Sequence, residues 1–251
     1  SLINGMLQFL SIIKVSIFNF LFLLLLSSIY LTITTNPGDV PMYWGFRSGD
    51  EDLIRKRYCL ICNVFKPERC HHCSICNKCI LNMDHHCPWI NSCIGYYNRK
   101  FFIQMLVYIE IILIYSLICN FLYIKSIFHK IYFFQLVEIE DLTYNSLVVF
   151  VYLIDVLAVF IIFNFTKFHL FLIFDNKTTI ETIDVKTDKY QSPYDLGRFN
   201  NFVQTFGRNK VLWVLPLKII TGHPIGNGID WDCEDELKDV DFNKKEENEE
   251  K

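Results

Sequence analysis

Cysteine and histidine side chains crowd one stretch of the sequence, which begins at Cys59 and ends at Cys93. Eight cysteines and four histidines lie within these 35 residues. Structural zinc takes four Cys or His ligands, and a Cys-x2-Cys spacing lets one tight turn offer two thiolates to the same ion. The pairs with this spacing are Cys59/Cys62, Cys73/Cys76 and Cys76/Cys79. The twelve candidate donors therefore predict two metal sites and leave some donors over for other chemistry.

The last histidine pair of this stretch can serve two purposes. In an extended segment neighbouring side chains point to opposite faces, so His85 and Cys87 share one side while His86 faces the other. An imidazole beside a cysteine can accept the thiol proton or stabilise the thiolate, and Asp84 is placed to orient the ring. The pattern indicates a metal ligand at His86 and a nucleophile at Cys87. On spacing alone, a purely structural zinc module explains these residues equally well.

Several motifs together resemble one known family. Residues 84–90 read Asp-His-His-Cys-Pro-Trp-Ile, which resembles the signature of the DHHC protein S-acyltransferases, or palmitoyltransferases. The upstream cysteine pattern resembles the rest of that family's cysteine-rich domain. Thr-Thr-Ile-Glu at 178–181 is similar to its TTxE motif, and residues 193–207 are similar to its C-terminal palmitoyltransferase motif. One departure is that Asn36 precedes Pro37 and Gly38, where the family usually has Asp-Pro-Gly.

By position, the resemblance implies a role for each residue of the motif. One zinc would be held by Cys59, Cys62, His72 and Cys79. A second zinc would be held by Cys73, Cys76, His86 and Cys93. Cys87 would be the acylated nucleophile, His85 its general base and Asp84 the partner that orients His85. The implied cofactors are two structural Zn²⁺ ions, with palmitoyl-CoA as the acyl donor substrate. In the two later motifs, Thr179 is expected to hydrogen-bond near Asp84, and Asn201 to tie the C-terminal element to the membrane core.

The resemblance also implies where CoA and the acyl chain bind. Phosphates favour clusters of positive charge, and the zinc domain offers a basic set. Its members are Arg57, Lys66, Arg69 and His71. The alternative is a basic rim that faces anionic lipid. Trp89 is expected to contact the bound substrate and, with Phe101, Phe102 and Met105, to line the acyl cavity, although aromatic residues are also common at membrane interfaces.

Composition and hydropathy indicate an integral membrane protein. The chain is 52% hydrophobic and 16% aromatic, and a span needs about 20 apolar residues. Spans are predicted at 15–35, 101–124 and 147–166. The expected fold is an α-helical polytopic membrane protein, a transmembrane helix bundle with a cytosolic, loop-rich, two-zinc cysteine-rich domain between spans. Because the family has at least four spans and the chain opens with Ser1, a first span is expected to be missing; a signal peptide at 7–25 is disfavoured.

The expected segments follow from these spans. In chain order they are 1–35 (span), 36–100 (zinc domain), 101–124 (span), 125–146 (lumenal or extracellular loop), 147–166 (span), 167–231 (C-terminal region with the two motifs) and 232–251 (acidic disordered tail). Nine basic residues lie at 36–100 but only two at 125–146, which places the zinc domain in the cytosol. That compartment is reducing and favours metal binding over disulfides. The Golgi or endoplasmic reticulum is expected rather than the plasma membrane.

The predicted function is protein S-palmitoyl transfer in two steps, through an acyl-Cys87 intermediate. Expected partners are fatty acyl-CoA, membrane lipid and membrane-associated proteins with cysteine thiols, and no nucleic acid. A zinc-stiffened membrane adaptor that lacks catalysis is the main alternative; a zinc transporter is disfavoured because the thiols lie between spans. No internal repeat is expected, and the intramembrane acids Glu110 and Asp155 are predicted either to share a proton or to contact the missing span.

Overall fold

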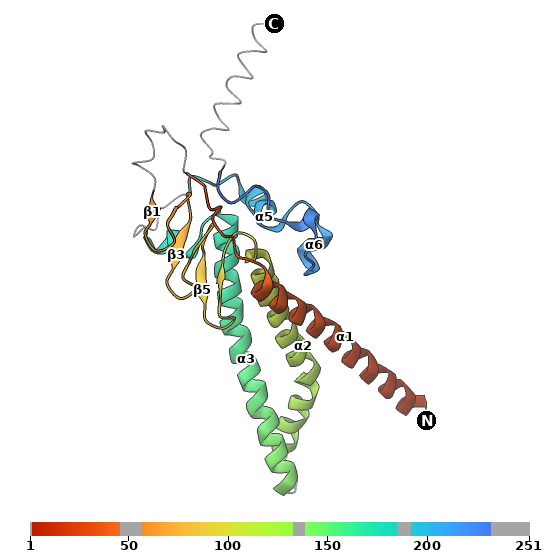
Figure 1. Cartoon of the computed structure of the whole chain (residues 1–251). Helices are drawn as coiled ribbons and strands as arrows, with labels where there is room; N and C mark the ends of the chain where they lie inside the picture. Colours follow the sequence, from red (N-terminus) through yellow and green to blue (C-terminus); the bar gives the residue numbers. More distant parts are fainter. Residues whose placement is uncertain (1, 46–56, 133–138, 185–191, 232–251) are drawn as a thin grey trace. The chain divides into compact units, whose positions relative to one another are not determined.

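The computed structural model describes residues 2–45, 57–132, 139–184 and 192–231 (Figure 1). Three long helices dominate it: α1 (Leu2–Thr34), α2 (Arg99–Tyr132) and α3 (Ile139–Phe174). Each contains a segment long and apolar enough to cross a membrane, at Gln8–Thr34, Arg99–His129 and Leu142–Phe174. These helices and the cysteine-rich region between them confirm the expected fold class, a mostly helical polytopic membrane protein. The predicted acidic tail lies outside the described residues.

The second and third helices are longer than the predicted spans of 101–124 and 147–166. α2 continues to Tyr132, and α3 begins at Ile139 and ends at Phe174. Neither extension contains glycine or proline, so nothing in the sequence stops the helical hydrogen bonding where the apolar run ends. All the residues predicted as a loop at 125–146 that the structure describes, 125–132 and 139–146, are therefore helical.

Three two-stranded antiparallel hairpins form the cysteine-rich region. They are β1 (Tyr58–Cys59) with β2 (Val64–Phe65), β3 (His71–Cys73) with β4 (Lys78–Ile80), and β5 (His85–Cys87) with β6 (Ser92–Ile94). Antiparallel pairing places side chains of directly opposite residues close together. In each of the last two hairpins, one histidine and one cysteine face each other in this way.

The last two hairpins are copies of one another, which corrects the expectation of no internal repeat. His72 pairs with Cys79, and fourteen residues later His86 pairs with Cys93. Both turns contain an asparagine with positive φ, Asn77 at 52° and Asn91 at 46°. The sequence signal is the recurrence of His-His-Cys-x3-Asn-x-Cys-Ile, a unit too short for a search for long repeats.

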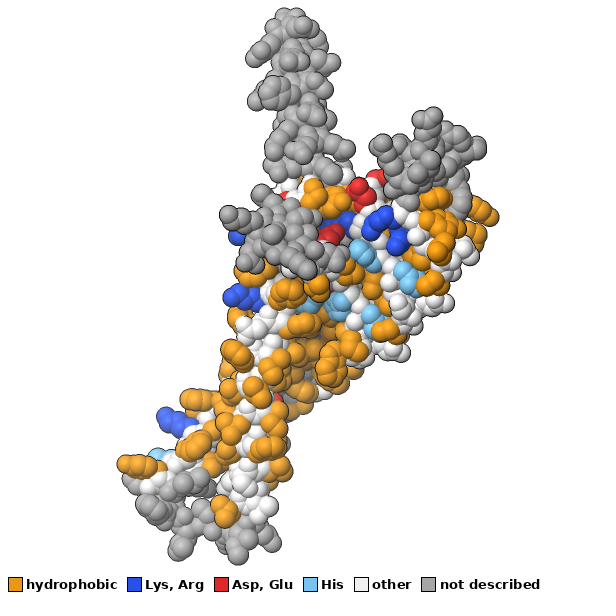
Figure 2. Space-filling model, turned by 90° about the vertical axis from the view of Figure 1, so that its left-hand side faces the viewer, with side chains coloured by type: hydrophobic (Ala, Val, Ile, Leu, Met, Phe, Trp, Pro, Cys, Tyr) orange, Lys and Arg blue, Asp and Glu red, His pale blue; other side chains and the backbone are white. Residues whose placement is uncertain are grey.

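The chain forms two compact units, and their boundary runs through all three long helices. Unit 1 comprises residues 1–26 and 105–168, and unit 2 comprises residues 27–104 and 169–251. Exposed hydrophobic side chains cover the helices of unit 1, as Figure 2 shows for one face. Examples are Phe150, Leu153, Leu157 and Phe160. Such a surface suits contact with lipid.

The C-terminal part of unit 2 consists of short helices. These are α4 (Thr179–Asp184), α5 (Arg198–Phe206), α6 (Val211–Val214) and the 3₁₀ turn η2 (Ile220–Gly222). Asn201 of α5 donates to the carbonyl of Phe174, the last residue of α3, at 2.7 Å. Asn201 was expected to tie the C-terminal element to the membrane core, and the structure places this bond at the very end of α3.

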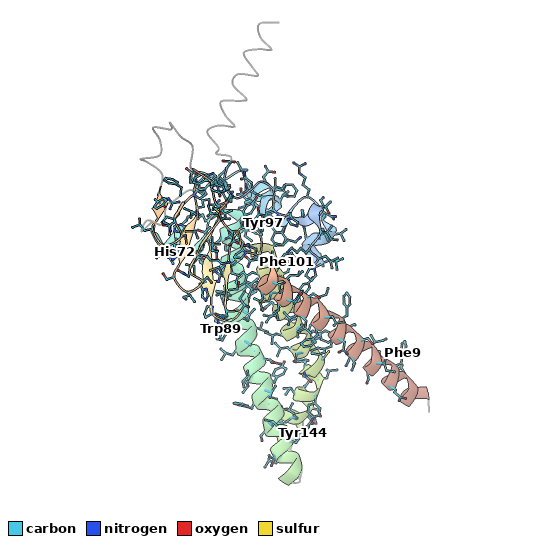
Figure 3. All side chains as sticks on the ribbon, in the orientation of Figure 1. Phe9, His72, Trp89, Tyr97, Phe101 and Tyr144 are labelled. Atoms are coloured by element: carbon cyan, nitrogen blue, oxygen red, sulfur yellow. The ribbon has the colours of Figure 1, made fainter. Side chains whose placement is uncertain are left out.

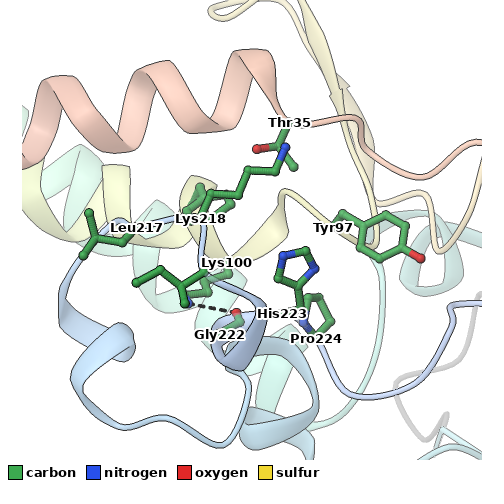
Figure 4. Close-up of a pocket in the computed structure, with 10 residues that line it drawn as sticks. Thr35, Tyr97, Lys100, Leu217, Lys218, Gly222, His223 and Pro224 are labelled. Carbon is green, nitrogen blue, oxygen red and sulfur yellow. Dashed lines mark hydrogen bonds between the residues drawn. The ribbon is translucent and has the colours of Figure 1, made fainter.

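The start of α2 holds the rest of this C-terminal segment. Lys100 is buried and donates from Nζ to the carbonyl oxygen of Gly222 at 3.0 Å (Figure 4). A Cβ on Gly222 would lie 2.9 Å from Nζ of Lys100 and 2.6 Å from Cδ1 of Leu212. Gln104 donates to the carbonyl of Leu212 at 3.1 Å. These contacts fix residues 212–222 against the first turns of α2.

The Asn-Pro-Gly departure from the family pattern leaves the local turn intact. The side-chain oxygen of Asn36 accepts a hydrogen bond from the backbone N–H of Gly38 at 2.9 Å. An aspartate carboxylate would accept this bond in the same way. Gly38 has φ 130°, and its carbonyl accepts from Leu81 N at 2.8 Å. The substitution is therefore compatible with the same contact between this turn and the hairpins.

Candidate active site and metal centres

Four donors meet at the first two hairpins. His72 Nδ1 lies 3.6 Å from Cys59 Sγ, 3.2 Å from Cys62 Sγ and 3.9 Å from Cys79 Sγ. Cys59 and Cys62 come from the β1–β2 hairpin, whereas His72 and Cys79 oppose each other across β3 and β4. This group is the first of the two ligand sets that the resemblance implied, and Figure 3 labels His72 within it.

A second set of four donors repeats this construction one hairpin further along. His86 Nδ1 lies 3.7 Å from Cys73 Sγ, 3.3 Å from Cys76 Sγ and 3.7 Å from Cys93 Sγ. The pair Cys73/Cys76 comes from the middle hairpin, and His86 faces Cys93 across the last one. The structure thus brings together the second implied set as well.

Both sets have the spacing that zinc requires. Tetrahedral zinc with Zn–S of about 2.3 Å and Zn–N of about 2.05 Å separates nitrogen from sulfur by about 3.6 Å. The six nitrogen–sulfur distances lie between 3.2 and 3.9 Å. Both groups contain three thiols and one imidazole, a donor set typical of structural zinc. The two clusters therefore can each hold one metal ion.

The third hairpin explains why Cys87 lies outside both clusters. Each Cys-x2-Cys turn contributes to a site completed by the next hairpin, so the turn of the last hairpin has no successor. There Cys87 occupies the position of Cys73, and Ile90 occupies that of Cys76. Cys87 belongs to neither donor cluster. Its side chain is 3% exposed.

Cys87 is linked to a fully buried carboxylate through His85. His85 Nδ1 lies 2.7 Å from Asp84 Oδ2. An ionised carboxylate can only accept, so Nδ1 carries a proton and Nε2 is the nitrogen that can accept the thiol proton. The two histidines of β5 join different groups, as the predicted alternation requires: His86 lies with three thiols, whereas His85 belongs to neither cysteine cluster and lies instead with Asp84 and His169.

The charges of this chain of groups favour a proton on His85. Burial lowers the pKa of His85, but its hydrogen bonds with Asp84 and Cys87 outweigh burial and raise the pKa to about 9. Burial raises the pKa of Cys87, but the hydrogen bonds from His85 and the backbone N–H of Ile90 outweigh it, and the net pKa is lowered. A thiolate beside an imidazolium is the nucleophilic form of such a pair.

Asp84 is ionised by its surroundings. Burial alone would raise the pKa of its carboxyl, but the Arg99 guanidinium and the hydrogen bond with His85 outweigh burial and hold the pKa well below its usual range. Arg99 Nη2 lies 3.2 Å from Asp84 Oδ1. Thr179 donates to the same carboxylate from its hydroxyl and from its backbone N–H, both at 3.0 Å. The predicted bond between Thr179 and Asp84 is thereby confirmed.

Two members of this site were missed by sequence reasoning. From the sequence, Arg99 is only one of the nine basic residues that indicate membrane orientation, and no sequence pattern points to His169 as a site residue. His169 lies near the end of α3, and its Nδ1 is 3.7 Å from Asp84 Oδ2. Its ring centroid lies 5.4 Å from that of His85 and 5.1 Å from that of Phe102. A histidine twelve residues before the TTxE glutamate would have been too weak a signal by itself.

The residues predicted to contact CoA fall into different environments. Arg57 and Lys66 are neighbours, since Lys66 N donates to the Arg57 carbonyl at 2.6 Å. Burial raises the pKa of the Cys70 thiol to about 11, although the charges of Arg57 and Lys66 oppose the shift. His71 is half-buried on β3. These three side chains are not enclosed by the protein.

Arg69 and Trp89 depart from the expectation. Arg69 is buried, and its guanidinium bonds to Glu181 and Asn176, so it does not join the accessible basic residues. Trp89 is 92% exposed, so most of its side chain does not contact the described part of the protein (Figure 3). Phe102, in contrast, is buried with its ring 5.3 Å from that of His85. Phe101 and Met105 are buried too.

The intramembrane acids of unit 1 do not bond to each other. Asp155 Oδ2 accepts from the Ser116 hydroxyl at 2.9 Å. Both carboxylate oxygens of Glu110 are buried without a hydrogen-bond partner among the described residues. The first of the two alternatives, a proton shared between these acids, is therefore wrong.

Comparison with known proteins gives consistent matches. A sequence model described as DHHC palmitoyltransferase matches residues 52–186. The chain is 32% identical over 232 residues to Probable protein S-acyltransferase 12 of Arabidopsis thaliana, which covers 85% of this chain and 76% of that protein. It is 34% identical over 242 residues to Probable protein S-acyltransferase 13 of the same plant, covering 86% and 76%. It is 37% identical over 164 residues to Palmitoyltransferase ZDHHC15 of Rattus norvegicus, covering 64% and 47%.

Proposed function

We propose a specific route for the acyl group, because this chain belongs to the DHHC palmitoyltransferase family and is a protein S-acyltransferase. A long-chain fatty acyl group moves from acyl-CoA to Cys87 and then to cysteine thiols of membrane-associated proteins. The observation that carries this proposal is the series Asp84–His85–Cys87, in which a hairpin cysteine that belongs to neither cysteine cluster lies beside a base held by a buried carboxylate.

The first step forms the acyl-enzyme. His85 Nε2 takes the proton of the Cys87 thiol, and the thiolate attacks the carbonyl carbon of the acyl-CoA thioester. The new C–S bond forms as the bond to the CoA sulfur breaks, and the proton on His85 passes to the departing CoA thiolate. Asp84 holds Nδ1 and stabilises the imidazolium while the proton resides there.

The second step reverses these roles for a protein acceptor. The acceptor cysteine gives its proton to His85, and its thiolate attacks acyl-Cys87. The Cys87 sulfur leaves as thiolate and is ready for another cycle. Overall, one thioester is exchanged for another, so the reaction needs no energy source beyond the acyl-CoA.

Zinc would serve structure in this scheme. The two clusters would each hold one Zn²⁺, which fixes the hairpins because closed four-ligand sites contribute folding energy. The hairpin register then sets where His85 stands relative to Cys87.

The accessible basic residues Arg57, Lys66 and His71 are the proposed contacts for the CoA phosphates. Arg57 and Lys66 lie directly before and after the strands of the first hairpin and are joined by a backbone hydrogen bond. Their proximity provides the clustered positive charge that phosphates favour. The excess of basic residues at 36–100 supports a cytosolic placement of this domain, where acyl-CoA is available. We propose residence in the Golgi or endoplasmic reticulum; fluorescence microscopy of the tagged full chain against markers of both organelles tests this placement.

An acyl-transfer assay separates the enzyme from a non-catalytic adaptor. The purified chain is incubated with labelled palmitoyl-CoA and then with a lipid-anchored peptide carrying one cysteine. The expected result is release of CoA and appearance of a hydroxylamine-sensitive label on the peptide. A Cys87→Ser variant with full metal content serves as the control. Equal labelling of the peptide by the parent and by this variant would contradict the proposal.

A further inference from the structure

Arg69 is an enclosed cation of the cysteine-rich region. Its side chain is 1% exposed. Nε and Nη2 donate to the two carboxylate oxygens of Glu181 at 2.6 and 2.9 Å. Nη1 and Nη2 donate to the side-chain and backbone oxygens of Asn176 at 2.8 and 3.0 Å. Four of the five guanidinium N–H groups are thus engaged inside the protein.

Two aromatic rings hold the same guanidinium from segments that follow the last long helix. The Arg69 guanidinium carbon lies 4.6 Å from the ring centroid of Tyr194 and 4.3 Å from that of Trp231. Guanidinium planes stack favourably on such rings, more so when water is excluded. Arg69 is therefore fixed in both position and plane, and it is closed to a phosphate ligand.

The Glu181 carboxylate, which binds Arg69, also caps the start of α4. Glu181 Oε2 accepts from the backbone N–H of Thr178 at 2.8 Å, and the Thr178 hydroxyl accepts from the N–H of Glu181 at 3.2 Å. This reciprocal pair is a capping box, which fixes the first turn of a helix. The residue inside the box is Thr179, whose hydroxyl and N–H bind Asp84.

We infer that the Arg69–Glu181 pair is a positioning clamp for acylation of Cys87, an inference that rests on the proposed function. Arg69 fixes Glu181, Glu181 fixes the turn at Thr178, and the turn aims Thr179 at Asp84. Asp84 in turn orients His85. Arg69 thus affects the rate of acyl transfer by positioning buried groups of the protein, whereas Lys66 and Arg57 affect the binding of CoA.

The chemistry of the clamp requires arginine. The two parallel bonds to Glu181 need a planar fork, which a lysine ammonium cannot provide. Arg69→Lys keeps the positive charge but loses the fork. Glu181→Gln keeps an oxygen for the Thr178 N–H, because glutamine also forms capping boxes, but it loses the charge that binds Arg69.

The first part of the test separates rate from CoA binding. Single-turnover acylation of Cys87 is measured over a range of palmitoyl-CoA and salt concentrations in parent, Arg69→Lys and Glu181→Gln. Each variant is expected to acylate about 10- to 100-fold more slowly at saturation, because a small misplacement of a catalytic group has effects of this order. The apparent KM and its salt dependence are expected to match the parent. Lys78→Met, at a largely exposed site 3.9 Å from Asp39, is the matched charge control and should change neither quantity.

The second part is a double-mutant cycle with Thr179→Val. If the clamp acts through Thr179, Arg69→Lys and Glu181→Gln should slow acylation by a smaller factor in the Thr179→Val background than in the parent background, because only the backbone N–H bond to Asp84 is left for the clamp to position. Metal content and thermal stability are measured for every variant, and Glu181→Gln decides the cycle if Arg69→Lys does not fold.

Three results would overturn parts of this account, and they are distinct. A raised KM that depends on salt would make Arg69 a CoA ligand and remove the clamp. Equal slowing in the parent and in the Thr179→Val background would show that the pair does not act through this residue. Absence of any label on Cys87 in the parent would remove the proposed function and the clamp with it.

Discussion

Thr179 donates two hydrogen bonds to one carboxylate, from its hydroxyl to Asp84 Oδ2 and from its backbone N–H to Asp84 Oδ1, each at 3.0 Å. The two residues are 95 positions apart in the sequence. This contact joins the turn after the last long helix to the strand that carries the nucleophile. It explains how a motif beyond the membrane spans can affect chemistry at Cys87.

Replacing Thr179 by valine tests that contact, because valine has nearly the same shape and lacks the hydroxyl. We expect acylation of Cys87 to slow about 10-fold or more, since hydrogen bonds to charged groups contribute about 1.5–3 kcal/mol. The backbone N–H bond remains, so metal content and thermal stability should change little. Thr179→Ser restores the hydroxyl and should recover most of the rate in the same assay; a valine variant at the parental rate would contradict the assigned role.

Metal analysis tests the two donor clusters. We expect two zinc ions per folded chain, and Cys62→Ser or Cys76→Ser should each lower the zinc content and the yield of folded protein, because structural zinc binding is coupled to folding. Cys70→Ser is the matched control: Cys70 is buried in the same region but belongs to neither cluster. If Cys70→Ser loses as much zinc as Cys62→Ser, the ligand assignment is wrong.

The double variant Arg57→Ala/Lys66→Ala tests the CoA contacts. We expect a higher apparent KM for palmitoyl-CoA, with little change in the saturated rate, and a smaller dependence of KM on salt than in the parent. The reason is that these cations would stabilise bound CoA without touching the reacting atoms. An unchanged KM together with weaker binding to anionic vesicles would instead favour the lipid-facing rim.

His85 and His86 are neighbours with different contacts, so their alanine variants should differ in zinc content and in acylation rate. His85→Ala should keep both zinc ions and slow acylation by about 10²- to 10⁴-fold, the range typical of general-base catalysis. His86→Ala should lower the zinc content and destabilise the hairpins, because His86 Nδ1 lies within 3.7 Å of three thiols. Equal zinc loss in the two variants would rule out this division of roles.

Much of this site could be predicted from local spacing. The alternation of a strand separates His86 from His85, and the cysteine pairs predict two metal sites, so both follow from short-range geometry. Which donors belong to each site followed from the family resemblance, because spacing alone does not exclude Cys70 or His71. The spans follow from apolar runs, although their ends do not, since helix length depends on where hydrogen bonding stops.

Long-range packing could not be predicted in this way. Arg69 has the charge expected of a CoA ligand, and only its burial against Glu181 and Trp231 shows a different role. His169 and Arg99 reach Asp84 because the ends of two long helices meet there, and no local pattern encodes that meeting. The repeat of the last two hairpins was present in the sequence, but its two copies are offset by only fourteen residues.

The most direct measurement maps the acyl group after a single turnover. Purified parent protein is mixed with one equivalent of labelled palmitoyl-CoA, quenched in acid, and analysed by peptide mass spectrometry with and without hydroxylamine. We predict a hydroxylamine-sensitive palmitoyl group on Cys87, none in Cys87→Ser, and transfer of the group from Cys87 to an added acceptor thiol. A label that maps to Cys70 or Cys119, or that persists unchanged in Cys87→Ser, would contradict the central claim that Cys87 carries the acyl group.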